Sequence, residues 1–372
     1  MTSIQIGPLQ LISLMMNLVF GKSIGYSSEV MARSVGRDAW LSSLFAFITG
    51  ALIITIFVWL ARRFAPDGPT DYIPRLLTRP VGVVVMLLLA LFFFVSFLTS
   101  AITVEQHVND YMMTETPFIL FVVVYTLIIL YGVGLGLEVA CRLSVLGAGL
   151  AILMNLLLIA GSVTHFTTSN LLPMFDKGLL PVVRASAAAD TDVAMATTSA
   201  LFLLPLVGHK QRWLKMALVG IGLGAVLVVI WPVLEIGVMG AEVTAQYLIA
   251  CMQMARAAEL SIYLHRYELL MVVLWCYSVI TQSMICLYCC VELITAVLPF
   301  KVNRHRLILT VGLLSIPWNW WLAHDRDAYG DFLAHIWSTV AVAIAFGLPL
   351  LVALVALLRP KVRHACNQSA SG

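Results

Sequence analysis

The chain has 372 residues, of which 61% are hydrophobic and only 11% are charged. A soluble domain carries roughly 25% charged residues, and the mean hydropathy of this chain is +0.97. These values exclude a soluble enzyme with a membrane anchor. They indicate a polytopic membrane protein that forms one domain over residues 1–372. The net charge of +3 is small, so the position of the charges is more informative than their number.

The first apolar segment, residues 8–33, is interrupted near its middle by a cation between two glycines. The interrupting residues are Gly21, Lys22, Ser23, Ile24 and Gly25. A charge at that depth of a membrane is costly and rare, and unwound backbone is tolerated there only where it lines a cavity. We therefore predict a broken helix that forms a binding site, as in secondary transporters. The alternative is a kinked helix in which Lys22 snorkels along its own stem.

About 20 apolar residues cross a bilayer as a helix, and ten such segments can be placed along the chain. They cover residues 8–33, 40–60, 80–104, 116–133, 137–162, 179–207, 212–237, 266–297, 305–323 and 333–358. The connection from Ala241 to His265 predicts a short helix on the surface of the bundle.

The loops between these segments predict the orientation. Loops on one side carry thirteen cations: Arg62, Arg63, Arg75, Arg79, Lys210, Arg212, Lys215, Lys301, Arg304, Arg306, Arg359, Lys361 and Arg363. The opposite loops carry seven: Arg33, Arg37, Lys177, Arg184, Arg256, Arg266 and Arg326. Cytoplasmic loops are enriched in Lys and Arg, so both termini are expected in the cytoplasm. An even number of spans requires both ends to lie on the same side, which agrees with this orientation. Residues 1–8 lack a basic region and a cleavage site, so we expect no cleaved signal peptide.

A second interruption is predicted in the sixth segment. After Gly178 and Pro181, the apolar run meets Ala187–Asp192, in which Asp190, Thr191 and Asp192 are the polar residues. We expect two half-helices that meet there. The alternative is a long outer loop from Asp176 to Asp192 with a short helix after it.

The interruptions in the first and sixth segments are best interpreted together. Matching breaks in two halves of five helices predict an inverted repeat with a binding site between them. The expected fold is therefore an all-α membrane protein with ten transmembrane helices, a 5+5 inverted repeat and broken helices one and six. Helix starts favour a carboxylate, whereas free carbonyls and Asp side chains favour an ammonium. A small zwitterion such as an amino acid satisfies both.

The other patterns in the sequence do not indicate a catalytic, redox or metal site. Cys286, Cys289 and Cys290 have metal-like spacing, but no His or carboxylate lies close on the same helix face; core packing is the preferred reading, with metal or redox chemistry as the alternative. Gly220-x-Gly222-x-Gly224 follows no strand, so we interpret it as close helix packing. Nothing suggests a catalytic triad. We expect no enzyme activity, no cofactor, no metal and no nucleic-acid partner.

Four stretches of the chain form a recognisable pattern. The first is the entry to the second helix, Gly36-Arg37-Asp38-Ala39-Trp40-Leu41-Ser42-Ser43-Leu44. The others are the inner loop Asp71-Tyr72-Ile73-Pro74-Arg75-Leu76, the loop into helix six, Asn170-Leu171-Leu172-Pro173-Met174-Phe175-Asp176-Lys177-Gly178-Leu179-Leu180-Pro181-Val182, and the approach to helix eight, Arg256 to Leu269. These stretches resemble, in the same order and over nearly the whole chain, the B subunits of bacterial spore germinant receptors.

The resemblance implies the spore germination permease family of the amino acid–polyamine–organocation superfamily, with its LeuT-like ten-helix inverted repeat. Members lie in the spore inner membrane with an A subunit and a lipoprotein C subunit, sense small nutrients and trigger germination. This chain departs at the first break, where Ser23 replaces a glycine and Lys22 a small or apolar residue. A secondary amino acid transporter and a non-binding scaffold subunit are the alternative functions.

Overall fold

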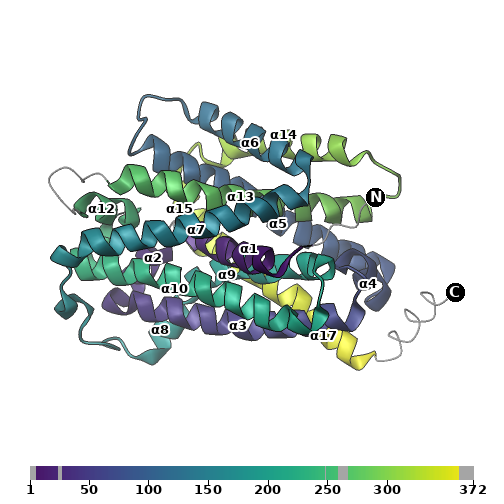
Figure 1. Ribbon diagram of the computed structural model, residues 1–372, viewed down its shortest axis with the longest axis horizontal. Helices are drawn as coiled ribbons and strands as arrows, with labels where there is room; N and C mark the ends of the chain where they lie inside the picture. Colours follow the sequence, from purple (N-terminus) through teal and green to yellow (C-terminus); the bar gives the residue numbers. More distant parts are fainter. Residues whose placement is uncertain (1–5, 24–26, 248, 259–266, 360–372) are drawn as a thin grey trace.

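The computed structural model describes residues 6–23, 27–247, 249–258 and 267–359. Every regular secondary-structure element in these residues is a helix, apart from one isolated parallel bridge between Ile6 and Val207. The helices form one elongated bundle, in which most long helices run along the same direction (Figure 1).

The helices are bounded as follows: α1 Pro8–Ser23, α2 Ser27–Val35, α3 Ala39–Phe64, α4 Pro69–Leu76, α5 Arg79–Asn109, α6 Phe118–Leu135, α7 Leu137–Ser162, α8 Leu179–Ala185, α9 Ala187–Leu203, α10 Trp213–Met239, α11 Ala241–Gln246, α12 Ala250–Ala257, α13 Tyr267–Val297, α14 Arg304–Leu322, α15 Arg326–Asp331, α16 Ser338–Val342 and α17 Leu348–Leu358. Two π-helical stretches, Phe332–Trp337 and Ala343–Gly347, join the last three helices into one rod.

Seven helical stretches of the described residues are long and apolar enough to cross a membrane. They are Ser27–Phe64, Arg79–Asn109, Phe118–Leu135, Leu137–His165, Lys210–Met239, Glu268–Val297 and Ala328–Leu358. The shorter helical stretch Pro8–Gly21 is also apolar.

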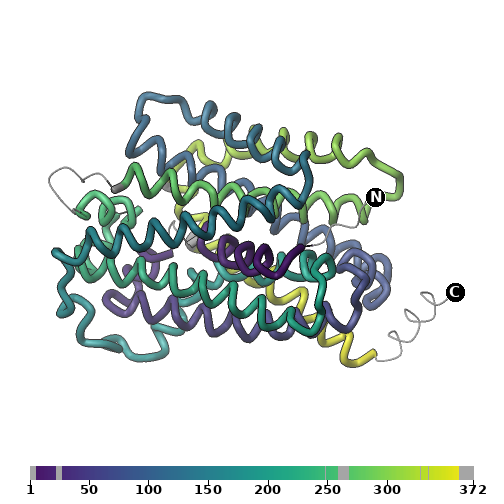
Figure 2. Tube along the Cα trace, viewed as in Figure 1, coloured from purple at the N-terminus to yellow at the C-terminus, as the bar shows by residue number. Residues whose placement is uncertain are grey.

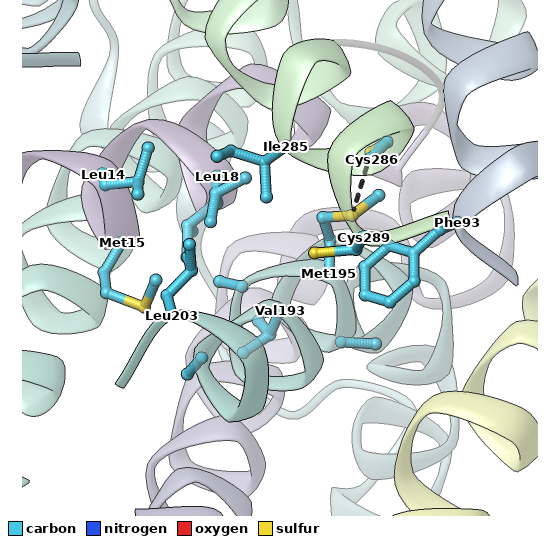
Figure 3. Packing of buried hydrophobic residues seen from close by; sticks show 14 of the residues in the cluster. Leu14, Met15, Leu18, Phe93, Val193, Met195, Leu203, Ile285, Cys286 and Cys289 are labelled. Carbon is cyan, nitrogen blue, oxygen red and sulfur yellow. Dashed lines mark hydrogen bonds between the residues drawn. The ribbon is translucent and has the colours of Figure 1, made fainter. Parts of the chain in front are cut away.

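Helix α1 lies at the centre of the bundle. It packs against α7, α9, α10 and α13, and the tube view shows it between α7 and α10 (Figure 2). Leu14, Met15 and Leu18 of α1 are fully buried and face Leu203 of α9 and Ile285 of α13 in the core (Figure 3). A helix that is apolar around most of its circumference is typically surrounded by other helices, and α1 fits this rule.

Two glycines of α10 allow this helix to approach α1 closely. A Cβ on Gly220 would lie 2.6 Å from the Met15 Cβ and 2.7 Å from the Ile12 carbonyl oxygen, and one on Gly224 would lie 2.8 Å from the Val19 Cβ. Gly222 has no atom within that reach. The interpretation of this glycine pattern as helix packing is confirmed for Gly220 and Gly224, which share one helix face.

The cysteines of α13 lie in the core. The Cys286 Sγ lies 3.3 Å from the Met195 Sδ of α9, and Figure 3 shows Cys289 beside Met195 and Phe93 of α5. Cys286, Cys289 and Cys290 are all buried. Their immediate surroundings are thus thioether, aromatic and aliphatic groups, which is the packing role that the sequence favours.

The first helix boundary lies between α1 and α2. Helix α1 ends at Ser23 and α2 begins at Ser27. Two of the residues predicted to form the break, Ile24 and Gly25, lie outside the described residues. Lys22 and Ser23 belong to the last turn of α1.

The second boundary differs from the prediction. The interruption was expected within Ala187–Asp192, but it lies at Ser186, between the end of α8 and the start of α9. The physical reason is local. Three consecutive alanines are strong helix formers, a carboxylate in the first turn is favoured by the helix dipole, and the Thr191 hydroxyl donates within the helix to the Ala188 carbonyl at 2.9 Å. The polar residues therefore open α9 rather than break it.

The segment after α10 contains the predicted short surface helix, α11, in which Glu242, Val243 and Gln246 are exposed and only Thr244 is buried. A second helix of this segment, α12, was not predicted, and it is buried in the bundle, where it packs against α7, α10 and α13. Cys251, Met252 and Met254 of α12 are inaccessible to solvent or nearly so. Helix α12 therefore closes the bundle over one end of α13.

Candidate functional site

The two helix boundaries meet at one hydrogen bond. The Ser27 hydroxyl, at the start of α2, donates to the Asp192 carboxylate of α9 with an Oγ–Oδ2 distance of 2.7 Å. Asp192 is only 2% exposed. Two residues before it, Asp190 is partly buried, and its Oδ1 accepts no hydrogen bond from the described residues. The first turns of α2 and α9 thus place polar groups side by side inside the bundle.

Two further carboxylates lie on the same side of the break. Glu29 of α2 and Glu235 of α10 are each 1% exposed. The Ser28 hydroxyl donates to the Glu235 carboxylate. Glu29 Oε1 and Glu235 Oε2 are buried and accept no hydrogen bond from the described residues. Serines at the start of α2 therefore hold two carboxylates that come from two other helices.

The end of α1 is fixed by α13. The Trp275 indole N–H donates to the Gly21 carbonyl at 3.2 Å, which satisfies one of the last carbonyls of α1, groups that have no partner within the helix. A Cβ on Gly21 would lie 2.7 Å from the Gln282 Oε1 and 3.1 Å from the Ser278 backbone. Only glycine allows α1 to approach α13 this closely.

Gln282 is the most unusual polar side chain at this end of the site. It is fully buried, and neither its amide nitrogen nor its amide oxygen has a hydrogen-bond partner among the described residues. Buried amides in folded proteins are almost always paired. This unpaired buried amide lies against the last turn of α1, where it has free donors and a free acceptor for a small polar ligand.

A histidine and a cysteine line the region between α5, α12 and α13. The His107 Nδ1–H donates to the Thr103 carbonyl at 2.7 Å, so its Nε2 faces the Cys251 Sγ at 3.8 Å. The His107 ring lies against Trp275, with centroids 4.7 Å apart. This contact links the residue that holds Gly21 to the buried helix α12.

The structure describes only some of the predicted site residues, and only Asp192 among them reaches the other helix boundary. Asp190, Thr191 and Asp192 all lie in the first turns of α9, and Asp192 is the one that reaches the α1–α2 boundary, through Ser27. Gly21 contacts α13. Of Lys22 and Ser23 the structure gives the backbone alone, and Ile24 and Gly25 lie outside the described residues.

Sequence reasoning missed Glu235, Gln282 and Trp275, and treated Glu29 only as a distant partner for Lys22. A signal for Glu235 was present, because it is the one carboxylate inside the apolar segment 212–237, and an ionisable residue inside a membrane is a functional candidate by default. Gln282 and Trp275 gave no such signal, since their importance comes from the approach of α1 to α13.

The chemistry available is recognition rather than catalysis. Carboxylate oxygens accept hydrogen bonds, and the start of α2 offers backbone N–H groups and the positive end of a helix dipole. Within the described residues, no group of three His, Cys, Asp or Glu side chains is arranged to hold a metal ion.

Solved structures with this fold are membrane transporters. The chain is similar to a Na⁺-coupled sialic acid symporter in a substrate-bound outward-open state, with a TM-score of 0.64 and 12% identity over 92% of this chain and 78% of that one. It is also similar to MhsT in complex with L-phenylalanine, with a TM-score of 0.61 and 14% identity over 94% of this chain and 98% of that one. At such identities the likeness shows the fold alone: an all-helical integral membrane protein with a LeuT-like architecture.

The relatives found by sequence identify the family, which the likeness in fold does not. The chain is 24% identical to the "Putative spore germination protein YfkT" of Bacillus subtilis (strain 168), over 90% of this chain and 92% of the relative. It is 20% identical to the spore germination protein YndE of the same organism, over 89% of this chain and 90% of the relative. A family model described as spore germination protein matches residues 5–323. Because that match covers well over half of the sequence, the chain belongs to this spore germination family of non-enzymatic, transporter-like membrane proteins.

Proposed function

We propose that this chain is the nutrient-sensing membrane subunit of a spore germinant receptor. The observation that carries the proposal is the hydrogen bond from Ser27 to Asp192, because it joins the start of α2 to the start of α9. A ligand bound beside it contacts two separate parts of the bundle at once. Binding that favours one arrangement of these parts over another shifts the population of the two, and that shift is the germination signal.

The proposed architecture is a ten-helix inverted repeat. In it, α1 and α2 form the broken first helix, and α8 and α9 form the broken sixth helix. The second half runs from α8 to α17 and is opposite in topology to the first. Both termini face the cytoplasm, as the cation-rich loops indicate. The subunit lies in the spore inner membrane beside an A subunit and a lipoprotein C subunit.

The proposed ligand is a small nutrient such as an amino acid. Its site comprises Gly21, Lys22, Ser23, Ile24 and Gly25 on one side and Asp190, Thr191 and Asp192 on the other. We assign the carboxylate of the ligand to Lys22 and its ammonium to the acidic first turn of α9. Support comes from the burial of Asp192 and its contact with Ser27.

One observation favours a second candidate, a secondary transporter. The solved structures with this fold include a symporter bound to its substrate. A transporter and a receptor can share the site, because the fold does not decide the function. What separates them is whether the bound nutrient crosses the membrane.

Two measurements on the purified protein test the proposal. In the first, unfolding temperatures are recorded with a panel of amino acids, sugars and nucleosides, because a ligand that binds only the folded state raises its stability. In the second, the nutrient that gives the shift is offered in labelled form to proteoliposomes. A shift without uptake supports the receptor. Uptake by this chain alone supports the transporter, and no shift with any nutrient contradicts both.

A further inference from the structure

Three carboxylates gather on the α2 side of the break, from three different helices. Glu29 comes from α2, Asp192 from α9 and Glu235 from α10, and each is at most 2% exposed. Two of them are oriented by neighbouring serines: Ser27 donates to Asp192, and Ser28 to Glu235. Because hydroxyl donors fix these carboxylates, their positions are set before any ligand arrives, which is how a binding site is preorganised.

Two of these carboxyl groups, Glu29 and Glu235, are buried without a positively charged partner in the described part of the chain. A buried charge in a folded protein is normally paired with an opposite one. Among the described residues, no Lys, Arg or His forms an ion pair with Glu29 or Glu235. The nearest cation along α2 is Arg33, which is exposed and donates instead to the Ala245 carbonyl at 2.9 Å.

Unused hydrogen-bonding groups point to a ligand independently of the charge. Glu29 Oε1 and Glu235 Oε2 have no partner among the described residues, and neither does the amide of Gln282 on the α1 side of the break. All three side chains are buried. Unmade hydrogen bonds of this kind cost about 1–3 kcal/mol each, so a folded protein retains them where a bound molecule completes them.

We propose that Glu29, Asp192 and Glu235 form the subsite for an ammonium group of the ligand. This inference rests on the proposed function and names the chemical class that the same site selects. An ammonium has three N–H donors, which suit the open oxygens of Glu29 and Glu235 and the additional negative charge of Asp192. Gln282, whose amide has two N–H donors and one acceptor oxygen, then contacts a polar group elsewhere on the ligand.

The charges of the ligand and the site narrow the chemical class of the ligand further. The ammonium group neutralises the carboxylates, whereas a carboxylate on the same ligand adds a negative charge and needs its own donors. An amine that lacks a carboxylate therefore still binds through this subsite. A derivative whose nitrogen is acylated carries no positive charge and does not bind.

The test uses matched probes on the full chain, purified into lipid nanodiscs. Unfolding temperatures are recorded with alanine, leucine and phenylalanine, with the amide of each, with the N-acetyl form of each, and with glucose and inosine. We expect stabilisation by at least one free amino acid and its amide and none by the N-acetyl forms. Stabilisation by an N-acetyl form equal to that of its parent, or by glucose or inosine alone, overturns the ammonium subsite and leaves the nutrient-sensing function standing. No shift with any probe overturns both.

Two variants then test the named residues. Glu29→Gln and Glu235→Gln keep the shape of each side chain and remove its charge. We expect each to weaken binding of the active amine about tenfold or more, as loss of a buried charge partner does. Their unfolding temperature without ligand stays the same or rises, because a neutral amide is less costly to bury than a carboxylate without a positive partner. Glu138→Gln is the matched control, since Glu138 is exposed and paired with Arg142. If both cluster variants fold and bind the amine with unchanged affinity, the subsite is refuted.

Discussion

The Ser27 hydroxyl and the Asp192 carboxylate, 165 positions apart in the sequence, form a 2.7 Å hydrogen bond inside the bundle. Ser27→Ala removes the donor and leaves the buried carboxylate without it. A hydrogen bond to a charged group contributes roughly 1.5–3 kcal/mol, so we expect a loss of stability of about that size. Thermal unfolding of the purified variant measures it.

A serine on the same helix provides the control for this change. Ser34 of α2 donates to the Met31 carbonyl within its own helix at 2.9 Å, so Ser34→Ala is expected to change stability by well under 1 kcal/mol. Spores with Ser27→Ala should also need a higher nutrient concentration to germinate. Equal unfolding temperatures for the two variants would show that the Ser27–Asp192 contact does not hold the helices together.

The packing of α10 on α1 gives a second prediction. In Gly220→Ala the new methyl group meets the Ile12 carbonyl at 2.7 Å and the Met15 Cβ at 2.6 Å, and the helices must separate. Overpacking of this kind costs about 1–3 kcal/mol. Gly222→Ala, two residues later with open space around it, instead gains up to about 1 kcal/mol of helix propensity. Opposite shifts in unfolding temperature are expected, and shifts of the same sign would contradict the close contact.

The contact between Trp275 and Gly21 gives a third prediction. Trp275→Phe keeps an aromatic ring beside His107 but removes the N–H that the Gly21 carbonyl accepts. The cost of the lost bond is about 1 kcal/mol, and the end of α1 loses its fixed position. We therefore expect a small fall in stability and a larger change in the nutrient dose response. Trp231→Phe serves as control, because the Trp231 indole nitrogen has no hydrogen-bond partner in the described part of the chain. A dose response of Trp275→Phe that matches this control would remove Trp275 from the site.

A fourth prediction concerns the π-helical stretch Ala343–Gly347. The Thr198 hydroxyl of α9 donates to the Ala345 carbonyl at 3.0 Å, so the helix that carries Asp192 is tied to an irregular turn. Irregular turns of this type often occur at functional sites. Thr198→Val keeps the shape and removes the donor, at an expected cost of about 1 kcal/mol. Thr197→Val is the control, since Thr197 donates only within α9. A germination response that changes in neither variant would make this contact merely structural.

Much of the helical layout follows from local properties of the sequence. Long apolar runs such as those of α5 and α13 are easily recognised, and the glycine pattern of α10 identified a helix contact correctly. The interruption near Asp190 was misplaced because polar residues suggested a break where alanines and a favourable dipole maintain a helix. Local composition predicts that a segment is helical more reliably than it predicts where the helix bends.

The site itself was only partly predictable, because its members are brought together by tertiary packing. Asp192 stood out as a carboxylate in an apolar segment. Trp275 and Gln282 are ordinary residues of an apolar helix until Gly21 allows α1 to approach them. No pattern within α13 indicates that contact, since it depends on the path of another helix.

Lys22 gives the last prediction, and it follows from the sequence together with the acidic cluster. A lysine at membrane depth is costly to desolvate, and the available anions are a ligand carboxylate or the carboxylates beyond the break. Glu29 is seven residues further along, about 10 Å up the axis of a continuous helix, so the break decides whether it comes within reach.

Lys22→Met keeps the bulk of the side chain and removes its charge, whereas Lys22→Ala removes both. If Lys22 binds the carboxylate of an amino acid, Lys22→Met raises the concentration of that amino acid needed for germination. The corresponding amide has no carboxylate for Lys22 to bind, so the concentration needed of the amide stays the same. A shift for the amino acid and none for its amide, at normal protein abundance, is the expected result. Unchanged dose responses for both ligands in both variants would make Lys22 a snorkelling side chain with no part in recognition.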